Sequence, residues 1–165
     1  MSVSIYVLEC VVMCTVFGVS IFGMLLVNPV SFIGDYPPEI QAQYYSSQHK
    51  EAVKERMTFL TILRKSVAII AFLFLFAWMA HMAGAETFVD GLLFVYGYMI
   101  VLAVFDTCFL DWVLFANIKQ VRLPGTEHMD REYHQKWFHV KVMLPMLPVF
   151  AVGGLLISLM MTWIW

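Results

Sequence analysis

The chain has 165 residues, of which 61% are hydrophobic and 13% are charged, and its formal net charge is −2. Soluble domains carry about 45–50% apolar and roughly 25% charged residues, so the composition excludes a water-soluble globular protein. It also excludes a disordered chain and, because the charge is not basic, a nucleic-acid-binding domain. We therefore predict an integral membrane protein, with the lipid bilayer as its first partner.

Four apolar runs reach the length of about 20 residues that a helix needs to cross the hydrocarbon core of a bilayer. They cover residues 5–27, 67–84, 91–115 and 142–165. The first run is not preceded by Lys or Arg and is not followed by a cleavage site, both of which a signal peptide would have. We therefore expect this run to be retained. The second and third runs are separated by a turn too short for anything but an antiparallel hairpin. The sequence predicts an all-α fold, a four-helix transmembrane bundle that forms a single domain.

The distribution of basic residues predicts the orientation. All ten Lys and Arg residues lie in or beside the segments 28–66 and 116–141, and none lies in the hairpin turn or at either terminus. Because short loops rich in Lys and Arg stay in the cytoplasm, both termini are expected on the outer side, N-out and C-out.

The first of these cytoplasmic segments contains a predicted interfacial helix. Asp35 is a suitable N-cap, Pro37 and Pro38 fit a first helical turn, and Glu39 favours the positive end of the helix dipole. Apolar residues then recur at nearly helical spacing opposite charged ones: Ile40, Tyr44, Tyr45, Val53, Met57 and Leu60 against Lys50, Glu51, Lys54 and Glu55. The pattern favours a helix on the cytoplasmic leaflet, and a cytoplasmic extension of the second span is the alternative.

Asp106 is the acidic residue whose depth needs an explanation. It lies about five residues, or roughly 7 Å, inside the inner boundary, where a charge costs about 2.5–3.5 kcal/mol. We expect a partner across helices, either Arg64 or His139, and the pair is interpreted as a structural ion pair or as part of a ligand or proton site. Asp111 lies about 140° further around an α-helix, so the two carboxylates are not expected on one face.

Several polar residues fall within a few residues of the inner boundary, and together they predict one ligand-binding site at the cytoplasmic mouth. The candidates are Asp35, Tyr36, Arg64, Asp106, Asp111, Trp112, Glu127 and His139. A set of separate helix caps and interface anchors is the alternative. No catalytic residue and no cofactor is assigned, and no metal site is predicted.

Sulfur-containing residues near the outer end of the first two spans leave one alternative open. They are Cys10, Met13, Cys14, Met79 and Met82, with His81 beside them. Thiolate, thioether and imidazole groups together suit Cu(I), whereas small residues four apart on a helix also favour close helix packing.

Short motifs span nearly the whole chain: NPVSFIGDYPPEI at residues 28–40, FDTCFLDW at 105–112, PGTE at 124–127 and FH at 138–139. With these elements the chain resembles a group of small bacterial four-span membrane proteins. That group has no assigned activity, so the resemblance implies a multi-pass protein of the bacterial inner membrane and no mechanism.

For function, we expect a non-enzymatic protein that binds a small molecule or lipid at the inner face, or an accessory subunit in a homo- or hetero-oligomer. A membrane-embedded enzyme that uses the inner-face acids and His139 is the alternative, and ion or metal transport is a lesser one. No GxSxG, P-loop or Rossmann glycine motif occurs in the sequence, which removes the common hydrolase, NTPase and dinucleotide-binding interpretations.

Overall fold

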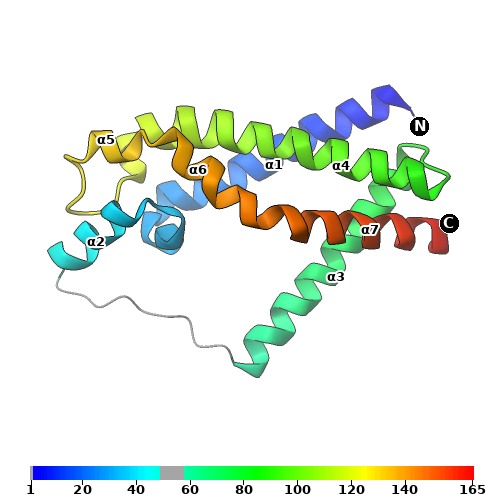
Figure 1. The fold of residues 1–165 in the computed structure, drawn as a ribbon, viewed down its shortest axis with the longest axis horizontal. Coiled ribbons are helices and arrows are strands. Elements are labelled where there is room, and N and C mark those ends of the chain that lie inside the picture. Colours follow the sequence, from blue (N-terminus) through cyan, green and yellow to red (C-terminus); the bar gives the residue numbers. More distant parts are fainter. Residues whose placement is uncertain (1, 49–57) are drawn as a thin grey trace. The chain divides into compact units, whose positions relative to one another are not determined.

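The computed structural model describes residues 2–48 and 58–165, and this part of the chain is helical without a strand (Figure 1). Four helices are long and apolar enough to cross a membrane: Val3–Val27, Phe59–Met82, Phe88–Phe115 and Lys136–Ile164. The prediction of an all-α protein with four candidate spans is confirmed. The second and fourth helices begin earlier than their apolar runs, because both helices continue through basic residues at their starts.

The spans differ in regularity. The first is α1 (Val3–Val27) and the second is α3 (Phe59–Met82). The third runs as α4 (Phe88–Phe105) and then as the π-helix η2 (Asp106–Phe115). The fourth consists of α6 (Lys136–Met143), the 3-10 turn η4 (Leu144–Met146) and α7 (Leu147–Ile164), with Pro145 and Pro148 at the change of geometry.

Contacts divide the chain into two compact units. Unit 1 comprises Met1–Met13, Lys54–Leu102 and Pro145–Trp165, and unit 2 comprises Cys14–Val53 and Ala103–Leu144.

Unit 1 is an apolar helix assembly in which α3 packs against α7 (Figure 1). Its core includes Phe76, Phe94 and Tyr98, all at most 2% exposed. Close helix approach depends on a small residue: a Cβ atom added at Gly97 would lie 2.6 Å from the Tyr6 hydroxyl. Small residues play this part in transmembrane packing generally.

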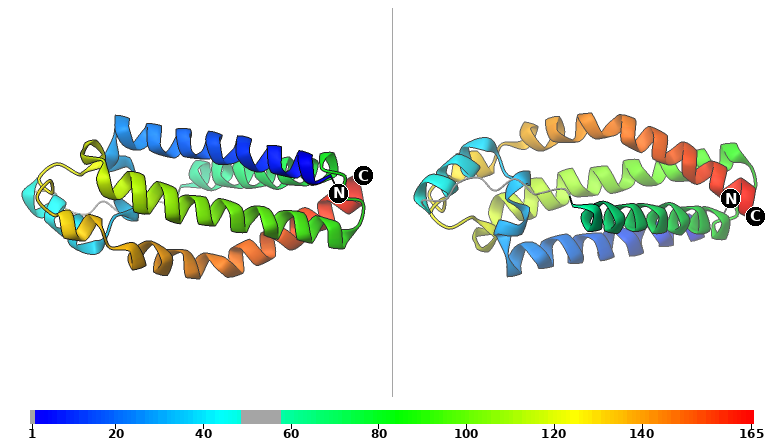
Figure 2. Two further views of the ribbon diagram at one scale, coloured as in Figure 1. Left: turned by 90° about the horizontal axis from the view of Figure 1, so that it is seen from above. Right: turned by 90° about the horizontal axis from the view of Figure 1, so that it is seen from below.

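Both chain termini lie beside the α3–α4 turn at one end of unit 1 (Figure 2). The Ser2 backbone N–H donates to the Ala83 carbonyl at 2.6 Å, and the His81 ring stacks on Trp165 with the centroids 4.9 Å apart. Gly84, at a φ of 79°, makes the turn between the two helices.

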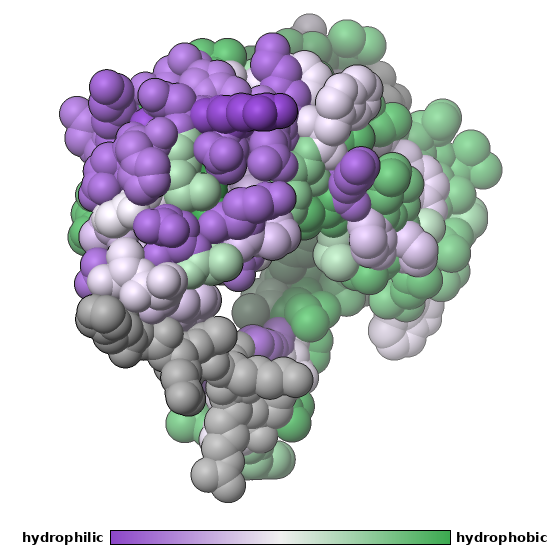
Figure 3. Space-filling model, turned by 60° about the vertical axis from the view of Figure 1, so that its left-hand side comes forward, coloured by the Kyte–Doolittle hydropathy of each residue, from purple (hydrophilic) through white to green (hydrophobic). Residues whose placement is uncertain are grey.

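Unit 2 has its own core beneath a polar surface. Tyr36, Ile40 and Leu123 are fully buried there, α2 (Pro38–Ser47) packs on α5 (Asp130–Tyr133), and α6 packs on η2. Figure 3 brings the α2 and α5 end of this unit forward and shows hydrophilic side chains gathered over it.

The helix expected after the first span exists as α2, but one detail of its start was wrong. Its N-cap is Pro37, and Asp35 is instead the last residue of the 3-10 helix η1 (Pro29–Asp35). Tyr36, which lies between η1 and Pro37, is fully buried in the core of unit 2. Residues 49–57, over which the helix was expected to continue, lie outside the described residues.

Candidate functional site

A buried tyrosine network fixes the loop that precedes α5. The Tyr36 hydroxyl donates to the Val121 carbonyl at 2.6 Å, and the Tyr133 hydroxyl accepts from the Leu123 N–H at 2.9 Å. The Thr126 and Tyr133 hydroxyls are also hydrogen-bonded, at 2.7 Å. Burial raises the pKa of both tyrosines. Tyr36, a predicted site residue, is therefore a neutral anchor of the loop.

Arg122 organises the same loop from inside. Its side chain is 2% exposed, forms an ion pair with Asp130 at 2.5 Å and lies 4.8 Å from the centre of the Tyr133 ring. One guanidinium N–H also donates to the Glu127 carbonyl at 2.7 Å. The hydrogen bond and the charge of Arg122 lower the pKa of Asp130. Sequence reasoning could not single out this buried cation, because a basic residue in a polar loop is usually solvated.

Glu127, another predicted site residue, closes the PGTE turn. Gly125 has a φ of 84°, and its N–H donates to the Glu127 carboxylate at 3.0 Å. Hydrogen bonds from the backbone N–H groups of Glu127 and Gly125 lower the pKa of that carboxyl. Its role in the structure is to cap a turn.

Four of the other candidates form what we call the acid–histidine cluster: Asp35, Asp106, Asp111 and His139. The Asp111 carboxylate lies 3.1 Å from His139 Nδ1, with His139 9% and Asp111 23% exposed. Asp106 interacts electrostatically with all three of the others. The ion pair of His139 is thus with Asp111, while Asp106 is a more distant neighbour.

Asp35 is the member of the cluster that reaches solvent. It is exposed at the end of η1, yet the surrounding chain removes part of its hydration and raises its pKa. The charge of Asp111 raises the pKa of Asp35 further, and His139 opposes both effects.

The π-helix explains why Asp106 and Asp111 belong to one cluster. The expected separation of about 140° assumed α-helical geometry, whereas η2 has i→i+5 hydrogen bonds, such as the one from the Ala116 N–H to the Asp111 carbonyl. Residues five apart are therefore stacked on one side of the helix. The expectation that the two carboxylates lie on different faces was wrong for this reason.

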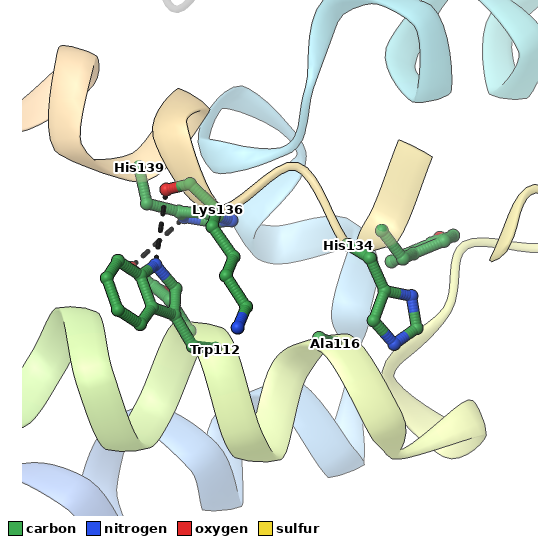
Figure 4. Close-up of a pocket in the computed structure, with 7 residues that line it drawn as sticks. Trp112, Ala116, His134, Lys136 and His139 are labelled. Carbon is green, nitrogen blue, oxygen red and sulfur yellow. Dashed lines mark hydrogen bonds and ion pairs between the residues drawn. The ribbon is translucent and has the colours of Figure 1, made fainter. Parts of the chain in front are cut away.

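Beside the cluster lies a small pocket with room for about one water molecule (Figure 4). It is lined by Asp111, Trp112, Ala116, Tyr133, His134, Lys136 and His139. The Trp112 indole N–H donates to the Lys136 carbonyl at 3.1 Å, and the Lys136 ammonium lies 5.3 Å from the centre of the same ring. The contact joins η2 to α6 at the edge of the pocket.

Buried polar atoms without a hydrogen bond occur within the described part of unit 2. They are Thr107 Oγ1, Arg122 Nε and His139 Nε2. An unmatched buried polar group costs about 1–3 kcal/mol, and bound water or a ligand is the usual remedy. His139 is the one of the three that belongs to the acid–histidine cluster.

The remaining sequence candidates lie elsewhere. Arg64 is exposed on α3 in unit 1. Of the sulfur-containing group, Cys10 and Met79 are buried in the core of unit 1 with Met13 packed against them, and His81 stacks on Trp165. Met82 is 50% exposed, and Cys14 belongs to unit 2. Over residues 2–48 and 58–165, no group of three His, Cys, Asp or Glu residues could hold a metal ion.

Comparisons with protein-family models, with curated proteins and with solved structures find no match to this chain.

Proposed function

We propose that this chain is a multi-pass protein of the bacterial inner membrane that binds a small molecule or lipid at its cytoplasmic side, in the acid–histidine cluster. One observation carries the proposal: the His139 side chain is only 9% exposed, its Nδ1 lies 3.1 Å from the Asp111 carboxylate, and its buried Nε2 has no hydrogen-bond partner within the described residues. Asp35 and Asp106 also interact with His139 electrostatically. A group that the fold orients and leaves unmatched is typical of a binding site.

The proposed orientation places this cluster on the cytoplasmic side. The Lys- and Arg-rich segments support it through the positive-inside rule. The neighbouring positions of Ser2, Ala83 and Trp165 within unit 1 further support two termini on the same side as the hairpin turn. With this orientation α2 lies at the cytoplasmic interface.

Two labelling experiments test the orientation. A tag at either terminus should be accessible from the periplasm, and cysteines introduced at Gln48 or Gln135 should react only with reagents that reach the cytoplasm. Termini that are protected in intact cells and accessible only after lysis would contradict the proposal.

An enzyme built on the same cluster is the second candidate, because a carboxylate-oriented histidine is also the base of a catalytic triad. In that arrangement a hydroxyl or thiol hydrogen-bonds to the free imidazole nitrogen. His139 Nε2 has no such partner within the described chain, which favours binding over covalent catalysis.

An accessory-subunit role, in a homo- or hetero-oligomer, is the other form of a non-enzymatic function. It is supported by α3, because only 6% of the apolar stretch of this helix is buried within the chain's own fold. Chemical cross-linking in native membranes would detect a partner on this helix.

Native mass spectrometry of the full chain in lipid nanodiscs tests the binding function. The wild type should carry a bound small molecule or lipid that is lost in Asp106→Asn and retained in the control Glu86→Gln, an exposed acid of unit 1. Equal retention by all three proteins, or no retention by the wild type, would contradict the proposal.

A further inference from the structure

The ion pair with Asp111 determines what His139 offers to a ligand. Its Nδ1 lies 3.1 Å from the Asp111 carboxylate, and an imidazole that takes part in an ion pair carries a proton on both nitrogens. Nε2 is therefore a donor that shares a positive charge. This atom is buried, belongs to a side chain that is 9% exposed and has no hydrogen-bond partner within the described residues. The group that satisfies it must be an acceptor, and an anionic oxygen is the strongest one.

The pocket that borders the His139 ring, between η2 and α6, contains a second donor for such an oxygen. Two of the other polar groups that line it are already used, because the Trp112 indole N–H donates to a backbone carbonyl and the Tyr133 hydroxyl holds the loop before α5. His134 is bonded through Nδ1 to a backbone carbonyl. The Lys136 ammonium lies over the Trp112 ring and forms no ion pair with an acid in residues 2–48 and 58–165. Lys136 can therefore pair with a ligand.

The exposed residues of this pocket are basic. Lys136 and His134 are exposed, whereas Ala116 and Tyr133 are buried, so the pocket opens to its surroundings on the side of Lys136 and His134. In the view of Figure 4 the Lys136 side chain lies between the Trp112 and His134 rings. A ligand thus meets the Lys136 ammonium before it reaches the buried interior of the pocket.

The charge of the lining residues favours an anion. Among the described residues that line the pocket, Asp111 is the only acid, and its ion pair with His139 offsets its charge. Lys136 then adds a positive charge. Asp35 and Asp106 interact with the imidazolium electrostatically but do not line the pocket, and water screens the exposed Asp35.

The size and the depth of the pocket indicate which anion fits. There is room for about one water molecule, and hence for a single oxygen atom of a ligand. A phosphate group carries several oxygens in different directions, so one can enter while another stays at the opening with Lys136. Trp112 lines the pocket and Trp137, 73% exposed, follows Lys136 on α6. Tryptophans mark the depth of the lipid head groups, which is where phospholipids carry their phosphate.

Resting on the function proposed above, we infer that the site binds a phosphate group, with one oxygen accepting from His139 Nε2 in the pocket and another paired with the Lys136 ammonium at its opening.

The experiment uses the full chain in dodecyl maltoside micelles, which contain no phosphate. In one arm inorganic phosphate is titrated against the thermal unfolding temperature, with acetate and chloride at matched ionic strength as controls. In the other arm phosphatidylglycerol is added, and diacylglycerol with the same acyl chains is the control lipid without phosphate. Stabilisation in the first arm alone identifies a soluble phosphate, and stabilisation in the second identifies a lipid phosphate.

The phosphate compound should raise the unfolding temperature of the wild type, and the control compounds should not. Lys136→Gln should weaken binding about tenfold, as loss of one charge-assisted hydrogen bond implies, and Lys136→Arg should retain it. Lys141→Gln is the matched control and should bind as the wild type does, because Lys141 is an exposed lysine of α6 that does not line the pocket. His139→Leu should abolish the effect, and Lys136→Gln decides the matter if that variant does not fold.

Other outcomes overturn the inference in distinguishable ways. Equal stabilisation by acetate or by diacylglycerol, or equal weakening by Lys136→Gln and Lys141→Gln, would refute the phosphate assignment. A co-purified ligand without phosphate that Asp106→Asn releases would also refute it and would leave the binding function standing. No response in either arm, together with the absence of any bound ligand in native mass spectrometry, would overturn both proposals.

Discussion

The Tyr133 hydroxyl offers the sharpest test of how unit 2 is held together. Tyr133→Phe removes one oxygen and keeps the ring, so the packing against Phe115, 5.5 Å away between centroids, is preserved. The Leu123 N–H, now 2.9 Å from that oxygen, is left buried without an acceptor. An orphaned buried donor costs about 1–3 kcal/mol. The Thr126 hydroxyl keeps its 2.7 Å bond to the Leu123 carbonyl, so the second loss is smaller.

We therefore expect Tyr133→Phe to lower the free energy of unfolding by about 2 kcal/mol. Equilibrium unfolding of the purified chain in mixed detergent micelles, followed by tryptophan fluorescence, measures this quantity. Tyr45→Phe is the matched control, because the Tyr45 ring is partly exposed and its hydroxyl makes no hydrogen bond within the described chain. Its effect should stay within about 0.5 kcal/mol of the wild type.

A double-mutant cycle that combines Tyr133→Phe with Thr126→Val measures whether the two hydroxyls stabilise the loop as one network or independently of each other. Because the two hydroxyls are 2.7 Å apart and share the Leu123 backbone, their effects should be coupled by at least about 0.5 kcal/mol. Additive effects of the two substitutions, or a Tyr133→Phe variant as stable as the Tyr45→Phe control, would refute the reasoning.

Three further predictions concern local geometry and charge. Gly125→Ala should lower the free energy of unfolding by about 1–3 kcal/mol, because φ is 84° there and the new Cβ would lie 2.5 Å from a serine hydroxyl; Gly34→Ala, with nothing within 4 Å, should leave thermal unfolding unchanged. Asp35 has a raised pKa, so the stability that its protonated form contributes is lost as pH rises through that pKa; Asp35→Asn should unfold at a higher temperature than the wild type at neutral pH and at the same temperature in acid. Asp130 has a lowered pKa, so its contribution is lost as pH falls through that pKa; Asp130→Asn should be less stable at neutral pH and show a flatter acid dependence in the same thermal assay.

The four candidate spans could be predicted from the sequence because a bilayer demands a fixed length of apolar helix. The helix after the first span was also predictable, since prolines, an acid and spaced apolar residues are local signals. Its cap was not, because whether Asp35 or Pro37 precedes the first turn depends on Tyr36 being pulled into a core formed by distant residues. Arg122 was missed for the same reason: its burial is created by Tyr133 and Asp130.

The relation between Asp106 and Asp111 could not be predicted, because periodicity assumes the 3.6-residue repeat of an α-helix. Hydrophobic patterning gives the same signal for an α-helix that contains a π-helical segment. The π-helix depends on tertiary structure. The sequence singled out Asp106 by its depth alone, and its neighbours differ from those expected because the helix is π-helical there.

Stability alone does not account for the arrangement that results. Asp111 pairs with His139, the pKa of Asp35 is raised by partial loss of its hydration and by the charge of Asp111, and the buried Nε2 of His139 has no hydrogen bond within the described residues. The fold holds Arg122 in the adjacent loop, where it neutralises an exposed aspartate instead of the cluster. π-Helical segments inside longer helices are often found at functional sites, and unmatched groups persist where a ligand matches them. The local cost at Asp35 and His139 therefore supports the ligand-binding site that we propose at the acid–histidine cluster.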